Sequence, residues 1–195
     1  MKLGAFSRLA VVLLLAGAAQ ADELSYAVSA RTAHGSDESV LRVPAFDTRL
    51  GTLVRVDITV DTVFDAHVRV ENIGPQLTYA QLALDSSMSL FVPGETAPFV
   101  ATDSRWASCA LPASDGSADF AGPSSMQFEA RFTLASKITL ASNLQKFETH
   151  GIPRLVALRS TAESAVSVAC NQPTIADDQF TVLRRLRITY VFDRA

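Results

Sequence analysis

The chain has 195 residues, 17 of them basic and 20 acidic, which gives a formal net charge of −3 at pH 7. This length suits one domain with a substantial core. The mildly acidic balance gives no support for nucleic-acid binding, which calls for a basic surface.

The first 21 residues have the features of a secretory signal peptide. Lys2 and Arg8 form a basic start, an apolar and small-residue run extends from Leu9 to Ala19, and Ala19-Gln20-Ala21 is a small-x-small cleavage signal. The run is shorter than the roughly 20 apolar residues of a spanning helix. We therefore expect 1–21 to be removed and 22–195 to be an exported domain, periplasmic or extracellular, without a transmembrane anchor. Loss of Lys2 and Arg8 leaves 15 basic and 20 acidic residues, a net charge of −5.

Alternation of apolar and polar residues with period two dominates the rest of the chain and predicts half-buried strands. Val54–Val60 and Ala66–Glu71 are expected to form an antiparallel hairpin, connected by Asp61–Asp65 and followed by a turn at Asn72-Ile73-Gly74-Pro75. Further strands are expected at Tyr26–Arg31, Glu38–Val43, Leu77–Leu84, Met88–Val92, Met126–Leu134, Leu155–Arg159, Ala165–Ala169 and Arg185–Phe192.

Helical periodicity is weak throughout, apart from a possible short helix at Ala141–Phe147, and Leu111–Ser125 is the longest clear loop. About ten strands with one polar face each predict an all-β fold, a single antiparallel β-sandwich that is Ig-like or jelly-roll-like. A closed barrel is the alternative.

One segment carries a family resemblance. Pro44, Phe46, Asp47, Leu50, Gly51, Thr52 and Leu53 make a Pro-x-Phe-Asp-x-x-Leu-Gly-Thr-Leu element, which runs into the alternating segment that ends at Asn72. This element, together with the aromatic-alternating last strand Leu186–Phe192, resembles the choice-of-anchor E domain of exported bacterial proteins.

The resemblance implies an exported β-sandwich-like domain with no assigned activity, usually delivered to the surface by a C-terminal sorting tail. The chain lacks such a tail, which favours a periplasmic or freely secreted form. The residues of this element are also expected to have structural roles. Phe46 and Leu50 are expected to close one end of the sandwich, Asp47 to cap a turn, and Gly51 to permit a tight entry into the strand.

Two cysteines, Cys109 and Cys170, belong to the exported part. In an oxidising compartment such a pair is first interpreted as a disulfide, and no spacing typical of a zinc site is present. Trp106, three residues before Cys109, is expected to pack over this disulfide rather than to stack on a sugar.

No catalytic, cofactor-binding or metal-binding residue is predicted. The sequence has no Gly-x-Ser-x-Gly element, and His34, His67 and His150 are interpreted as loop or solvated strand positions. Asp115–Asp119 alternates oxygen side chains as calcium loops do, but Phe120 and Met126 occupy the positions where an EF-hand needs Gly and Glu. A solvated loop is favoured there, and a calcium role stays open.

Arg185 and Arg187 share the solvent face of the last strand, where cross-strand pairing with acidic residues is the ordinary explanation. Taken together, the sequence favours a non-enzymatic envelope or extracellular protein with a structural or interaction role. The alternative is a binding module for surface glycans or a partner protein that uses the loops Asp115–Ser125 and Ala141–Pro153.

Overall fold

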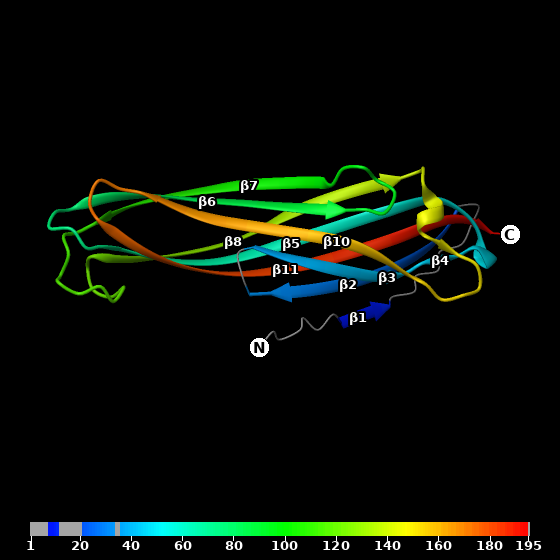
Figure 1. The fold of residues 1–195 in the computed structure, drawn as a ribbon, viewed down its shortest axis with the longest axis horizontal. Helices are drawn as coiled ribbons and strands as arrows, with labels where there is room; N and C mark the ends of the chain where they lie inside the picture. Colours follow the sequence, from blue (N-terminus) through cyan, green and yellow to red (C-terminus); the bar gives the residue numbers. More distant parts are fainter. Residues whose placement is uncertain (1–7, 12–20, 34–35, 195) are drawn as a thin grey trace.

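The computed structural model describes residues 8–11, 21–33 and 36–194. Long strands form an elongated sandwich of two sheets (Figure 1). The strands are β1 (Arg8–Val11), β2 (Asp22–Thr32), β3 (Ser36–Pro44), β4 (Phe46–Asp47), β5 (Gly51–Asn72), β6 (Thr78–Phe91), β7 (Phe99–Leu111), β8 (Ser125–Leu140), β9 (Glu148–Thr149), β10 (Leu155–Ala169) and β11 (Thr174–Arg194). Two single-turn 3₁₀ helices, η1 (Thr48–Leu50) and η2 (Leu144–Lys146), lie between strands, so the helix expected at Ala141–Phe147 is reduced to η2.

The order of the strands identifies the fold as a jelly roll. Sheet A has the order β1-β2-β11-β5-β8 and sheet B the order β3-β10-β6-β7, and all their pairings are antiparallel. Among the long strands from β2 to β11, each connection crosses from one sheet to the other except β6–β7. Eight strands connected in this way are typical of a jelly roll, and the predicted antiparallel sandwich is confirmed.

The expected signal peptide lies mostly outside the described residues, which include only Arg8–Val11 and Ala21 of it. Arg8–Val11 form β1, which pairs with Tyr26–Ser29 at the edge of sheet A (Figure 1). Within the described part of the chain, no helix is long and apolar enough to cross a membrane.

The predicted hairpin over residues 54–71 is wrong, because these residues belong to one 22-residue strand, β5. Val56, Val60, Phe64 and Val68 are all even-numbered and all buried, so the inward-facing phase never changes across the expected connection. Asp61 and Asp65 take outward positions in the same strand. Two other pairs of predicted strands are likewise continuous, as β6 and β10.

The core lies between the sheets, as the alternation predicts. Its main cluster is formed by inward apolar residues from both sheets, among them Leu41, Val56, Ile58, Phe64, Met88, Leu90, Leu158, Leu186, Ile188 and Tyr190. A smaller cluster of Val68, Val70, Ala80, Leu82 and Leu111 fills the end toward the 112–124 loop.

Candidate functional site

The expected disulfide is wrong, since Cys109 and Cys170 are free thiols. Cys109 pairs with Ala80 of β6, and Ala169, the residue before Cys170, pairs with Gln81 of the same strand. The cysteines therefore flank β6 on opposite sides, two strand spacings or about 10 Å apart. A disulfide allows at most about 7 Å between the Cα atoms of its two cysteines, so this separation is too large for one. Instead, the Cys170 thiol lies 2.8 Å from Thr174 Oγ1, and burial raises the pKa of Cys109.

Trp106 does not pack over sulfur either. It lies on the outer face of β7, a strand that the sequence did not reveal, and it is 74% exposed. Its cross-strand neighbour is Ala83. The indole is therefore available to solvent on the outer face of sheet B.

The family-like element closes one end of the sandwich, with one exception to the prediction. Phe46 is fully buried against Tyr190 and Phe192, with ring centroids 5.9 and 4.9 Å away. Leu50, expected to share this role, is 48% exposed, and the fully buried Phe147 supplies the second apolar group.

Polar contacts hold the same end. Asp47 Oδ1 accepts hydrogen bonds from the backbone N–H groups of Arg49 (3.0 Å) and Gly151 (3.2 Å), so the predicted cap is present. The hydrogen bonds from Arg49 hold the pKa of Asp47 well below its usual range. A Cβ on Gly51 would lie 2.0 Å from the carbonyl oxygen of Asp193, which explains the glycine by close backbone approach.

The remaining residues of the element are also structural. The carbonyl of Pro44 accepts a 2.8 Å hydrogen bond from the Tyr190 hydroxyl. Leu53 is buried, and Thr52 faces solvent at the start of β5. These contacts are those of an end closure.

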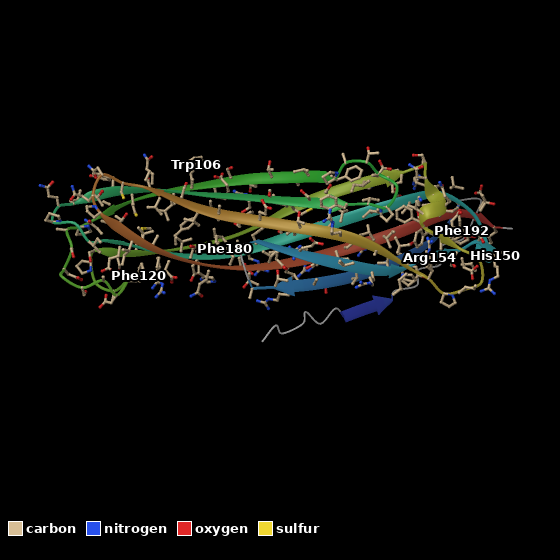
Figure 2. The ribbon with its side chains drawn as sticks, viewed as in Figure 1. Trp106, Phe120, His150, Arg154, Phe180 and Phe192 are labelled. Atoms are coloured by element: carbon tan, nitrogen blue, oxygen red, sulfur yellow. The ribbon has the colours of Figure 1, made fainter. Side chains whose placement is uncertain are left out.

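The two described histidines each have a local partner. His67 Nδ1 lies 3.3 Å from Glu129 Oε1 on the outer face of sheet A. His150 Nδ1 lies 3.0 Å from the Thr48 hydroxyl, at the end of the molecule opposite the one that carries Phe120 (Figure 2). The third, His34, lies outside the described residues.

The acidic side chains of the 112–124 loop serve the loop itself. Asp115 Oδ1 accepts from the backbone and hydroxyl of Ser117 (3.1 and 2.8 Å), and Asp119 Oδ1 accepts from the Ala121 N–H (2.9 Å). The buried Glu71, which the sequence did not single out, accepts from the Phe120 N–H at 2.6 Å. Within the described ranges, no three His, Cys, Asp or Glu side chains are grouped so as to hold a metal ion.

The outer face of sheet A carries a different kind of feature. Arg185 and Arg187 of β11 line a shallow hollow of about 490 Å³ together with Asp61. The lining also includes the small side chains Ala27, Ser29 and Thr59. Arg185 is paired in register with Asp61 and Ser29, and Arg187 with Thr59 and Ala27.

Two further cations extend this surface. Lys137 of β8 is the cross-strand neighbour of Thr59, and Arg31 of β2 is the neighbour of Leu183. Both face outward and are exposed. We call the surface formed by Arg31, Lys137, Arg185 and Arg187 the basic patch. Because Asp61 is its single carboxylate, it has a formal excess of three positive charges.

Other cations of the same face lie in ion pairs. Arg131 lies 3.4 Å from Asp65, Arg55 lies 3.0 Å from Asp57, and Arg69 pairs with Asp177. Among the described residues, by contrast, no ion pair within 4 Å involves any cation of the basic patch. The expected cross-strand acidic neighbour is present for Arg185, which lies opposite Asp61, whereas the register partners of Arg187, Thr59 and Ala27, are uncharged.

The chain has a weak similarity to some solved structures. No family model and no curated protein matches the chain. A structure of infectious bursal disease virus, Gx strain, is 12% identical over 97% of this chain and 39% of that chain, with a TM-score of 0.23. The VP2 subviral particle of the same virus is 11% identical over 97% of this chain and 42% of that chain, with a TM-score of 0.14. The chain thus spans about two fifths of these proteins, and neither likeness bears on what it does.

Proposed function

We propose that the chain is an exported, non-enzymatic β-sandwich protein of the cell envelope or extracellular space that binds an anionic component there through the basic patch. The observation that carries the proposal is a set of four exposed cations, none of which is in an ion pair within 4 Å among the described residues, on a face where Arg55, Arg69 and Arg131 are paired. Arg185 and Arg187, two residues apart on one face of β11, repel each other over about 7 Å. An anionic partner would remove that repulsion and supply the missing counter-charges.

Three further observations support this role. The residues at the start of the chain have the pattern of an export signal. His67, on the outer face of sheet A, and His150, at one end of the sandwich, lie at separate places in the fold. The family-like element, from Pro44 to Leu53, closes one end of the sandwich.

The test is co-sedimentation of the purified protein with isolated envelope material at low and high salt. We expect binding at about 0.1 M salt and release at about 1 M, where the screening length falls from roughly 10 to 3 Å. The variant R185A/R187A should stay in the supernatant at both. R131A is the matched control, because Arg131 is an exposed arginine of the same face that already pairs with Asp65. Equal sedimentation of all three proteins would refute the proposal.

A second candidate is binding of an uncharged glycan on the outer face of sheet B, favoured by the exposure of Trp106 (74%) and Tyr79 (68%). Exposed aromatic rings stack on the apolar faces of sugars. If this candidate is correct, W106A should abolish sedimentation with envelope material, and salt should have little effect. Loss of binding in R185A/R187A with W106A unaffected would exclude it.

A further inference from the structure

The cations of the basic patch are spread out instead of converging on a point. Arg185 and Arg187 are two residues apart in β11, which separates their Cα atoms by about 7 Å. Lys137 is two strands away from Arg187, a distance of about 10 Å, and Arg31 lies about 8 Å from Arg185 on the other side. The patch extends over about 20 Å from Arg31 to Lys137. A small anion could touch one or two of these groups, whereas a polymer with repeated negative charges could reach all four.

The surface between the cations is shaped for a hydroxyl-bearing ligand. Arg185 and Arg187 rise from the central strand of the hollow, β11, between the small side chains Ala27 and Ser29 of β2 and Thr59 of β5. Asp61 lines the same hollow and is not part of any ion pair within 4 Å among the described residues. A carboxylate in that position repels a plain polyanion but accepts hydrogen bonds from hydroxyl groups. The cations of the patch would bind carboxylates, and Asp61 would accept hydrogen bonds from hydroxyl groups. A sugar acid carries both kinds of group.

The chemistry of the patch disfavours the other polyanions. A membrane-binding surface presents apolar side chains beside its cations. The large exposed hydrophobic residues of the described chain, such as Trp106, Ile152 and Leu155, belong to other parts of the fold. Single-stranded nucleic acids need aromatic rings for base stacking, and the basic patch contains none.

From this geometry we infer that the ligand of the basic patch is a linear polysaccharide with repeated carboxylates, of the polyuronate type, lying across β2, β11, β5 and β8. The inference rests on the proposed function and specifies its ligand. Long-range attraction contributes little, because the exported part, with 15 basic and 20 acidic residues, has a formal charge of −5. Recognition instead depends on short-range contacts between carboxylates and the guanidinium groups.

The test is calorimetric titration of the purified protein with polygalacturonate. A neutral polysaccharide of similar length, polyglutamate and anionic phospholipid vesicles serve as comparison ligands. We expect saturable, salt-sensitive binding of polygalacturonate that exceeds binding of the comparison ligands. R185A/R187A should weaken it on the order of tenfold or more, since two exposed charge contacts are lost, while R131A should remain within about twofold of the parent protein. Emission from Trp106, on the opposite sheet, should not change.

The other results have distinct meanings. Polyglutamate or vesicles that bind as tightly as polygalacturonate, and still require the two arginines, would overturn the polyuronate ligand while leaving the proposed function in place. Binding of polygalacturonate that R185A/R187A does not weaken would overturn the inference, as would saturable binding accompanied by a change in Trp106 emission. If none of the anionic ligands bound and envelope sedimentation also failed, both the inference and the proposed function would be wrong.

Discussion

Arg184 should respond to substitution in an unusual way, because its guanidinium is fully buried between the two sheets. Its Nη1 donates to Ser39 Oγ (3.2 Å) and lies 3.4 Å from Asp37 Oδ2, and its Nη2 donates to the Asp37 carbonyl (2.9 Å). Burial lowers the pKa of Arg184 from its usual value, and Asp37 opposes that shift. Three buried polar atoms of the described core, Arg184 Nε, Thr62 Oγ1 and Ser160 Oγ, have no hydrogen-bond partner.

The prediction concerns the variants Asp37→Asn and Arg184→Met, separately and together. Asp37→Asn keeps the shape but leaves a buried cation uncompensated, a change that costs about 3 kcal/mol. We take the lower end of the usual range because the Asp37 side chain is 26% exposed. Arg184→Met removes the charge and the unpaired Nε, and methionine fills similar space. Its effect should lie between a loss of about 1 and a gain of about 2 kcal/mol.

The assay is urea and thermal unfolding followed by far-UV circular dichroism, with the four proteins arranged as a double-mutant cycle. At roughly 2–4 °C per kcal/mol for a domain of this size, Asp37→Asn should lower the Tm by about 6–12 °C. The double variant should be about as stable as Arg184→Met alone, because Asp37 has nothing left to neutralise. Additive losses, or an Asp37→Asn effect below about 0.5 kcal/mol, would refute the claim that this carboxylate compensates a buried charge.

Three further predictions concern Gly51, Asp47 and the two cysteines. Gly51→Ala should destabilise the protein by more than about 1 kcal/mol in the same unfolding assay, because its Cβ would collide with the Asp193 carbonyl. Gly116→Ala, whose Cβ meets nothing within 4 Å, should cost less. Equal losses in the two variants would contradict the claim that close backbone approach requires Gly51. The folded-state pKa of Asp47 lies below its ordinary value of 3.8, so its stabilising contribution is complete above about pH 4 and declines as the pH falls further. Unfolding measured from pH 6 downward should therefore show the stability difference between the parent protein and Asp47→Asn shrinking below pH 4, and a difference that grows there would be inconsistent. Alkylation of the unfolded protein without reductant should label both cysteines, whereas failure to label either one would reveal a disulfide that the separation across β6 forbids.

The sequence predicted the sandwich because alternation is a local property. Inward residues of β5 and β11 keep one phase over many positions, and that phase alone determines which face is buried. The length of the strands was harder to predict. Asp61 and Asp65 are ordinary turn residues by composition, yet outward positions of a continuous strand also accept them.

The failed disulfide and the missed basic patch have the same cause. Which strands become neighbours in a jelly roll depends on long-range topology, and no short segment of sequence encodes it. Cys109 and Cys170 look like a pair until β6 is placed between them. Arg31 and Lys137 are distant in sequence from Arg185 and Arg187, and only the order β2-β11-β5-β8 brings the four together.

The most direct test of the account is fractionation of the producing cells, with the protein detected in cytoplasm, periplasm, envelope-bound material and medium, and with its intact mass measured in each. We predict an exported species that begins at Asp22. The parent protein should be held on envelope or extracellular material and released from it by high salt, whereas R185A/R187A should be exported equally well but recovered as free protein. Retention of the full-length chain in the cytoplasm, or identical distribution of the parent protein and R185A/R187A, would contradict it.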